Sequence, residues 1–378
     1  KKLPPYLFVE IDRAKKKARD EGRDIIDLGI GDPDIPTPSF IIDAMNKAMR
    51  DPKNHRYPLD AGLPEFRQAI AKWFQKRYNA QLDPNAEILP LIGSKEGIAH
   101  MPLAVINPGD VVLVPDPCYP PYKSGTYFAG GEVALMPLVD KHQFLPDLKA
   151  INQNALHRTK MMFLNYPNNP TGAVCDKSFL KDVVAFAVKH NIIICNDAAY
   201  SEMGYDGYKA PSIFEIDGAK DVAIEFHSLS KTFNMTGWRI GFACGNRELI
   251  ELLAKVNSNL DSGVFFAVQW AGVAAFENYD THMKSVLKVY EERRNTLVDG
   301  LNKIGWKVDK PKATFYIWTK VPPRHTSATF AKDLLDKADI IATPGNGFGK
   351  YGEGYFRMAL TVDKKRISEA VDRIKKRL

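Results

Sequence analysis

The stretch Glu225–Gly241 reads E-F-H-S-L-S-K-T-F-N-M-T-G-W-R-I-G and contains the most informative pattern in the chain. An apolar run over residues 222–226 ends in two serines and Lys231, and Arg239 follows eight residues after the lysine, between two glycines. A run of this length, bounded by small polar residues, is typical of a strand that ends in a loop. The spacing suits a nucleophilic lysine beside a phosphate site.

This interpretation rests on what a lysine nucleophile requires. Lysine forms a Schiff base with a carbonyl only as the free amine, so desolvation or a nearby positive charge must lower its pKa. Arg239 could supply that charge while its planar guanidinium binds phosphate oxygens, and Ser228 and Ser230 would add hydroxyl donors. Taken alone, the same residues also fit a polar turn with a solvated lysine. The segments upstream of residue 225 distinguish the two interpretations.

Length and composition exclude several classes of protein. The chain has 378 residues, 45% of them hydrophobic, which predicts one large domain or two closely joined ones. A net charge of +7 with interleaved acidic residues does not indicate nucleic-acid binding. No apolar run approaches the ~20 residues that span a bilayer, and no secretory signal is evident. The four cysteines form no metal-binding or disulfide pattern, so we expect no metal and a cytoplasmic protein.

Up to about residue 270, short apolar runs alternate with helical periodicity, which predicts an α/β fold with a mostly parallel sheet flanked by helices. The expected strands are 25–28, 88–92, 111–114, 132–136, 160–165, 192–195 and 222–226. The expected helices are 8–20, 38–49, 64–78, 94–105, 119–129 and 176–190, the last capped by Asp176.

The remainder predicts a smaller α+β domain. A long amphipathic helix is expected over 277–303, further helices over 329–337 and from 363, and strands over 306–308, 314–318, 340–342 and 355–360. The predicted division is an arm over 1–24, a small domain of 25–45 and 275–378, and a large domain of 46–274. Arg357, the one charge in an apolar strand, fits either an edge residue that reaches solvent or a carboxylate clamp, and the pattern alone favours the edge.

Polar residues follow the ends of several predicted strands. Asn169, Asp197 and the Ser228–Lys231 cluster each follow a separate predicted strand. Ser94 is the first residue of the helix that follows a fourth strand, 88–92. In parallel sheets ligands bind at the carboxyl ends of strands, so these side chains can converge, although Asp197 alone could be a helix cap. The set offers a lysine for an aldehyde, donors for a phosphate, a carboxylate for a ring nitrogen, and an amide and phenol for a ring hydroxyl. Pyridoxal phosphate has those groups.

Three motifs make the resemblance to a family specific. The segment 228–241, Asn-Asn-Pro-Thr-Gly at 168–172 and Asn-Asp-x-x-Tyr at 196–200 together resemble the fold-type I pyridoxal-phosphate aminotransferases of classes I and II, over essentially the whole chain. The resemblance implies an aspartate aminotransferase-like large domain with a seven-stranded sheet that binds the cofactor. It also implies a homodimer that acts on amino acids and 2-oxo acids. A lyase or racemase with the same cofactor, and a regulator that uses the fold as a sensor, are the alternatives.

The resemblance also assigns roles to single residues. Lys231 would bind the cofactor covalently and move the substrate proton, and Asp197 would keep the ring nitrogen protonated. The other implied cofactor contacts are Asn169 and Tyr200 at the ring hydroxyl, Tyr119 on the ring face, Ser94, Lys95, Ser228, Ser230 and Arg239 at the phosphate, and Tyr57 from the neighbouring subunit. Arg357 would hold the substrate α-carboxylate, which reverses the edge interpretation.

Two further stretches resemble one branch of this family. Leu-Pro-Pro-Tyr-Leu-Phe at 3–8 and Gly-Ser-Lys-Glu-Gly-Ile-Ala-His at 93–100 are similar to the LL-diaminopimelate aminotransferases of lysine biosynthesis. By this resemblance the substrates are LL-diaminopimelate and 2-oxoglutarate. The substrate contacts it implies are Tyr6, Gly31, Lys95, Tyr119, Asn169 and Arg357, with Glu96 and 259–263 as candidates for the distal end. Aspartate, alanine and aromatic aminotransferases share much of the pattern and stay as alternatives.

Overall fold

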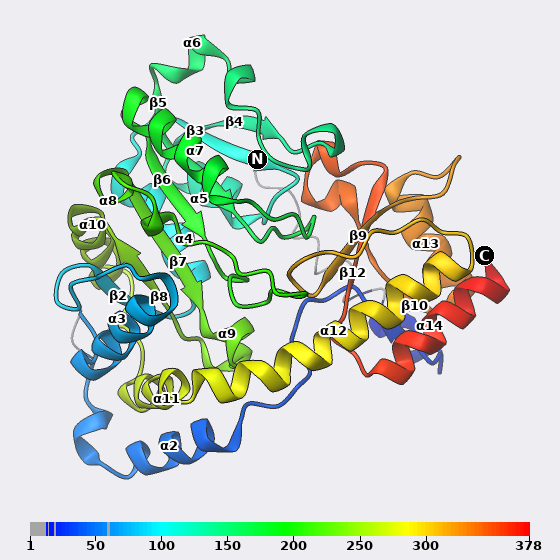
Figure 1. The fold of residues 1–378 in the computed structure, drawn as a ribbon, viewed down its shortest axis with the longest axis horizontal. Helices are drawn as coiled ribbons and strands as arrows, with labels where there is room; N and C mark the ends of the chain where they lie inside the picture. The colour runs from blue at the N-terminus through cyan, green and yellow to red at the C-terminus, as the bar shows by residue number, and fades with distance from the viewer. Residues whose placement is uncertain (1–12, 14, 19, 59–60) are drawn as a thin grey trace.

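The computed structural model describes residues 13, 15–18, 20–58 and 61–378, and a seven-stranded sheet lies at the centre of its larger part (Figure 1). The strands in spatial order are β2 (Ile88–Leu91), β8 (Gly241–Gly245), β7 (Ala223–Ser228), β6 (Ile193–Asp197), β5 (Thr159–Asn165), β3 (Val111–Asp116) and β4 (Glu132–Pro137). β8 runs antiparallel to both its neighbours, and the remaining pairs are parallel. The predicted mostly parallel sheet is therefore confirmed.

β8 is the strand of this sheet that the sequence did not predict. Its residues, Gly241 to Gly245, read G-F-A-C-G, and glycine and alanine have low strand propensity. The strand forms because it pairs with both β2 and β7, which tertiary structure supplies and local sequence does not.

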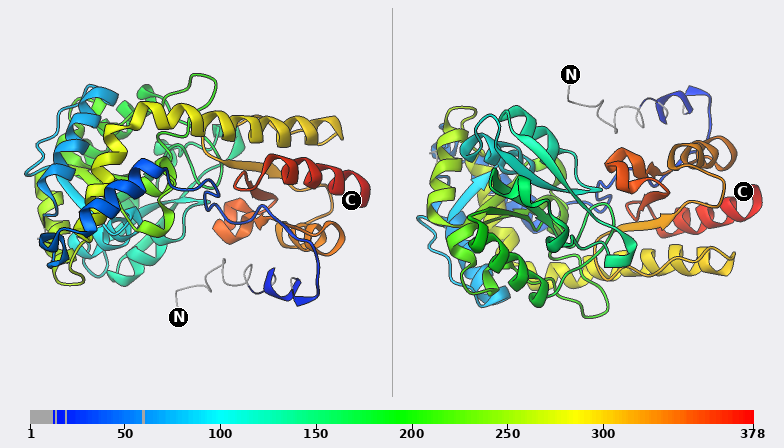
Figure 2. Two further views of the ribbon diagram at one scale, coloured as in Figure 1. Left: turned by 90° about the horizontal axis from the view of Figure 1, so that it is seen from below. Right: turned by 90° about the horizontal axis from the view of Figure 1, so that it is seen from above.

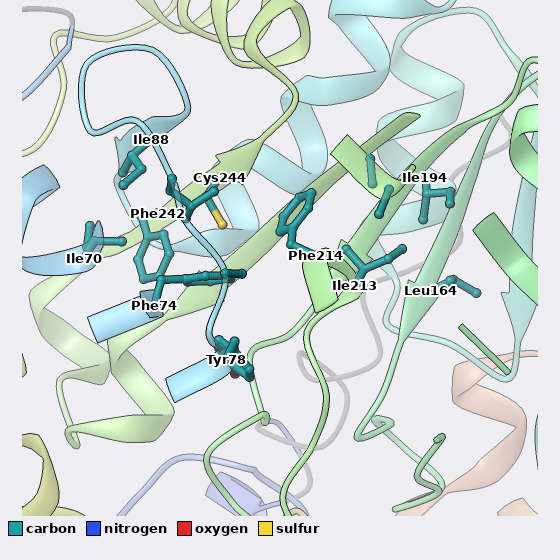
Figure 3. Close-up of a cluster of buried hydrophobic side chains, with 14 of the residues drawn as sticks. Ile70, Phe74, Tyr78, Ile88, Leu164, Ile194, Ile213, Phe214, Phe242 and Cys244 are labelled. Carbon is teal, nitrogen blue, oxygen red and sulfur yellow. The ribbon is translucent and has the colours of Figure 1, made fainter. Parts of the chain in front are cut away.

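Helices cover both faces of the sheet. One face packs against α3 (Pro64–Tyr78), α7 (Lys177–His190) and α11 (Phe266–Glu277), and the other against α4 (Ser94–Val105), α5 (Pro121–Phe128) and α10 (Arg247–Ser258). Figure 3 shows Phe74 of α3 and Phe242 of β8 in the first of these cores. The predicted cap of α7 is confirmed, because the Asp176 side chain accepts a hydrogen bond from Phe179 N at 2.9 Å.

A second, smaller core lies around a three-stranded antiparallel sheet and a two-stranded parallel one. The three strands are β11 (Thr343–Pro344), β12 (Tyr355–Ala359) and β9 (Tyr316–Lys320), with β12 in the middle, and β1 (Ile26–Asp27) pairs with β10 (Ile340–Ile341). The helices α13 (Ser327–Ala338), α14 (Lys364–Arg377) and α12 (Tyr279–Lys303) contribute to this core. Figure 2 shows α12 running from the larger part of the molecule to α14. The exact division into domains stays a prediction.

One prediction in this region is wrong. Residues 306–308 form no strand, because the Asn302 side chain bonds both the N–H and the carbonyl of Val308 and so takes the place of a partner strand. The long helix expected over 277–303 is confirmed as α12, which begins two residues later, at Tyr279. The helix α11, which ends just before it at Glu277, was not predicted.

The N-terminal helix expected over 8–20 falls partly outside the described residues, and the described residues from 13 to 20 are helical. Within the part of the chain that the structure describes, no helix combines the length and the apolar character needed to cross a membrane.

Candidate active site

The predicted site residues gather where the central strands β5, β6 and β7 end side by side. Asn165, the last residue of β5, links two of these ends: its side-chain amide donates to Asp197 O at 2.8 Å, and its Oδ1 accepts a hydrogen bond from Asn169 N at 2.7 Å. The loop with Asn169 is thereby fixed against the end of β6. The sequence placed Asn165 at a strand end but gave it no role.

Lys231 lies in the one-turn helix α9 (Leu229–Thr232) directly after β7. Its Nζ donates to Gly31 O at 2.9 Å and lies 5.7 Å from the centre of the Phe315 ring. Burial lowers the pKa of Lys231 to about 8, and the positive charge of Arg357 and Arg239 acts in the same direction against the opposing effect of Asp32. A substantial fraction of free amine is therefore present near pH 8.

Asp197, the last residue of β6, is buried at 4% exposure. Its Oδ2 accepts a hydrogen bond from the Tyr122 hydroxyl at 2.6 Å, and its Oδ1 accepts one from Ala199 N at 3.2 Å. Burial raises the pKa of Asp197 to about 6, against the lowering effect of these two donors and of His227. The carboxylate is thus anionic above that pH and placed to pair with a cationic group.

Arg357 is buried at 1% exposure in β12, the middle strand of the small sheet, so the edge interpretation is wrong. Its Nη1 donates to Asn169 Oδ1 at 2.7 Å and its Nη2 to Gly29 O at 2.8 Å. The guanidinium also lies over the ring of Tyr316, 4.1 Å from the ring centre. A buried guanidinium held by neutral acceptors is suited to bind a carboxylate.

Tyr316 is a central residue of the site that the sequence treated only as part of a strand. Its hydroxyl bonds the Tyr200 hydroxyl at 2.8 Å, and a Cβ atom on Gly31 would overlap with it. Gly31 therefore has a structural reason to be glycine, since it lies between Tyr316 and the Lys231 amine. The aromatic run 314–318 gave no local signal for this role.

The residues predicted at the phosphate lie around the N-terminus of α4 and the start of α9. Ser94 is the first residue of α4, and the guanidinium of Arg239 lies against Gly93, where a Cβ would overlap with Nη2. Ser228 caps α9 by accepting a hydrogen bond from Ser230 N at 3.3 Å. Hydroxyls, helix N-termini and an arginine in one place fit a phosphate. Lys95, the next residue of α4, is exposed.

Of the remaining predicted residues, Tyr119 is half-buried, and its ring lies edge-on to that of Tyr122, with ring centres 5.9 Å apart. Tyr57 is 84% exposed. Tyr6 lies outside the described residues. Glu96, on the first turn of α4, accepts a hydrogen bond from Ile92 N at 2.6 Å and bonds the Asp261 carboxyl. Burial and Asp261 raise the pKa of Glu96 to about 8.

Two sets of side chains among the described residues have ligand atoms close enough for a metal ion, although we predicted none. Glu225, His227 and Cys244 form a buried set, and Glu96, His100 and Asp261 a half-buried one. The Glu225 carboxylate already accepts hydrogen bonds from the side chains of His227, Asn196 and Ser212 and from Ile213 N, so its capacity is used within the protein.

A buried lysine of lowered pKa, a buried carboxylate and a group of anion-binding donors, all at strand ends of this fold, are the features expected of a pyridoxal-phosphate-dependent enzyme. The family model for "Aminotransferase class I and II" matches residues 23–374, and the chain belongs to that family. It is a pyridoxal-phosphate-dependent aminotransferase, and the prediction of family and fold class is confirmed.

Named relatives are similar over their whole length. The chain is 55% identical to the "LL-diaminopimelate aminotransferase" of Moorella thermoacetica, covering 100% of this chain and 96% of the relative. Among solved structures, substrate-bound BacF from Bacillus subtilis is 38% identical with a TM-score of 0.95, covering 100% of this chain and 95% of BacF. A mutant of Thermus thermophilus aspartate aminotransferase is 29% identical with a TM-score of 0.92, covering 100% and 98%.

Proposed function

We propose that this aminotransferase exchanges the amino group between LL-diaminopimelate, or tetrahydrodipicolinate in the reverse direction, and the 2-oxoglutarate/glutamate pair, in lysine biosynthesis. The observation that supports this substrate is the identity of 55% with the Moorella relative of that name over the full chain. The half-buried Glu96–Asp261 pair is a structural feature suited to it, because a second amino group on the substrate would find a carboxylate there.

The cofactor supplies an aldehyde for the amino group and withdraws electrons from the substrate α-carbon. The residues of the chain would supply the rest. Lys231, with a pKa near 8, can both accept a proton from the α-carbon and return one, as a general base and acid should at neutral pH. The negative charge of Asp197 would hold the ring nitrogen protonated, because the attraction between opposite charges is stronger in a buried site than in water.

Arg357 would orient the substrate through its α-carboxylate. Its two donors already face the site through Asn169 and Gly29, so a carboxylate can exchange for these neutral acceptors and gain a charge-assisted bidentate bond. Asn169 and Tyr200 would then contact the ring hydroxyl of the cofactor, with Tyr200 oriented by Tyr316. Ser94, Lys95, Ser228, Ser230 and Arg239 would hold the phosphate, and Tyr119 would cover the ring.

A homodimer completes this proposal. Tyr57 is 84% exposed, and Gly263 of the 259–263 segment lies against Pro58, so the two segments are neighbours on the surface. The Tyr57 side chain is thus accessible to a neighbouring subunit, and tyrosine is enriched at subunit interfaces. We place the enzyme in the cytoplasm, as the four buried free cysteines favour.

The substrate is tested with a single-turnover measurement on the enzyme loaded with cofactor. LL-diaminopimelate should convert the cofactor absorbance much faster than aspartate, alanine or phenylalanine does. Glu96→Gln should lower kcat/KM for LL-diaminopimelate by about 10- to 100-fold, and glutamate, which lacks the distal amine, serves as the internal control. Preference for aspartate or alanine would overturn the substrate and leave the family unchanged.

The shared site is tested by mixing two inactive variants. Lys231→Ala lacks the nucleophile, and Tyr57→Ala lacks the phenol that we expect to act in the neighbouring subunit. Random reassociation should restore about a quarter of the wild-type sites, because half of the dimers are mixed and each of these contains one complete site. If Tyr57 served its own subunit, mixing would restore nothing.

A further inference from the structure

The Asp197 carboxylate is held by a tyrosine that the sequence did not place in the site. Tyr122 lies in α5 and is 0% exposed. Its ring stacks on the ring of Phe163, with the ring centres 4.7 Å apart and the ring planes at 15° to each other, and the ring of Tyr119 packs edge-on against it. These contacts fix the ring, so the hydroxyl has a defined direction toward Asp197 Oδ2, at 2.6 Å.

The two oxygens of Asp197 are therefore in different situations. Oδ2 accepts a short bond from the Tyr122 hydroxyl, whereas Oδ1 accepts a longer one, 3.2 Å, from Ala199 N. A carboxylate oxygen can accept two hydrogen bonds, so Oδ1 keeps acceptor capacity for another donor. Bonds from a hydroxyl to a carboxylate are shorter and stronger than neutral ones, and they stabilise the anion.

The charged and titratable groups around this carboxylate come from three elements. α5 contributes Tyr122, the segment after β6 contributes Tyr200, and β7 contributes His227, whose charge favours the Asp197 anion. The ring of His227 itself bonds the Glu225 carboxylate, at 2.8 Å. The direct side-chain donor to Asp197 in this group is Tyr122.

We propose that Tyr122 is a positioning residue for catalysis, which keeps the Asp197 carboxylate anionic and turned so that Oδ1 serves the ring nitrogen of the cofactor. The inference depends on the cofactor and not on the identity of the substrate, so it stands whether or not LL-diaminopimelate is the amino donor. Burial raises the pKa of a carboxyl, and hydrogen bonds to the anion lower it. Without the Tyr122 hydroxyl one of these hydrogen bonds would be lost, so Asp197 would take up a proton at higher pH.

The test compares Tyr122→Phe with Tyr78→Phe. Tyr78 is a matched control because its buried hydroxyl also donates to a carboxylate, Glu202, at 3.0 Å, but away from the cofactor residues. The dissociation constant of pyridoxal phosphate is measured on each apoenzyme between pH 5 and 8. Wild type and Tyr78→Phe should lose affinity below about pH 6, and Tyr122→Phe should lose it about one pH unit higher, with about threefold weaker binding than wild type at pH 6.5 and about tenfold weaker binding at pH 5.

Turnover gives a second readout. In the loaded enzyme, Tyr122→Phe should lower kcat by about tenfold with KM for the amino donor within about twofold, because the substrate contacts are untouched. With a cofactor analogue in which C–H replaces the ring nitrogen, Tyr122→Phe should have no further effect. Equal pH profiles for the two tyrosine variants, or an undiminished effect with the analogue, would overturn the proposal.

A second variant keeps the test decisive if Tyr122→Phe yields no folded protein. Phe163→Leu leaves the hydroxyl in place and removes the ring that Tyr122 stacks on. It should shift the pH dependence of cofactor affinity in the same direction by a smaller amount. An unshifted profile in Phe163→Leu would count against a positioning role.

Discussion

Arg357 Nη1 donates to Asn169 Oδ1 at 2.7 Å, although the two residues are 188 positions apart in the sequence. The bond joins the middle strand of the small sheet to the loop that follows β5. It brings the proposed substrate clamp to the residue predicted to contact the cofactor ring. A carboxylate bound by Arg357 would therefore lie beside Asn169, the residue expected to contact the cofactor.

Arg357→Lys should reduce kcat/KM for every amino and 2-oxo acid by about 100-fold or more, roughly 3 kcal/mol, because lysine cannot form the bidentate bond. Cofactor affinity should change little. Arg294→Lys is the matched control: Arg294 is equally buried and pairs with Asp206 at 2.6 Å, outside the site. Steady-state kinetics on both variants check this, and an equal loss in the two would contradict the clamp.

The pKa of Lys231, about 8, sets how fast the apoenzyme can bind pyridoxal phosphate covalently. Only the free amine reacts, so the rate should rise about tenfold per pH unit up to pH 8 and level off above it. Stopped-flow absorbance across pH 6–10 measures this. Arg239→Gln removes one of the positive charges that lower this pKa, so the midpoint should move upward; a midpoint near 10.5 in the wild type would exclude a buried nucleophile.

The predicted convergence of Asn169, Asp197 and Lys231 is confirmed, because these residues follow β5, β6 and β7, which are parallel neighbours and end at one edge of the sheet. Strand order in the small sheet is a different matter. The apolar pattern around Arg357 is the same for a middle strand as for an edge, so the pattern favoured the wrong one. Tyr122 and Tyr316 were missed because their roles depend on which hydroxyl they meet across the fold. Apolar periodicity accounts for the burial of their rings and not for these bonds.

Asp197→Asn should make the apoenzyme more stable at neutral pH while weakening cofactor binding. The folded-state pKa of Asp197, about 6, is above the ordinary 3.8, so the folded protein holds the proton more tightly and the wild type loses stability as pH rises from 4 to 6. The variant avoids this loss and should gain about 1–3 kcal/mol at pH 7.5 and almost nothing at pH 4.

Urea denaturation of the two apoenzymes at both pH values measures the difference. Asp116→Asn is the control, because the buried Asp116 carboxylate is paired with Lys123 at 2.7 Å and bonded by Tyr351 N at 2.8 Å. Removing its charge should destabilise the protein by about 3 kcal/mol. A loss of stability in Asp197→Asn at pH 7.5 would mean that the carboxylate is better stabilised in the apoenzyme than its burial indicates.

Gly31→Ala should disrupt the site without unfolding the protein, because the added Cβ would overlap with the Tyr316 hydroxyl and ring. Tyr316 must then move, and with it the bond to Tyr200 and the surface under Arg357. We expect kcat/KM to fall by about 100-fold with a change in Tm of only a few degrees. Gly31→Ala combined with Tyr316→Phe should recover part of the loss, since the nearest clashing atom is the hydroxyl. Gly237→Ala, where a Cβ would meet open space, should be close to wild type. If both glycine variants were equally active, the contact between Gly31 and Tyr316 would have no part in shaping the site.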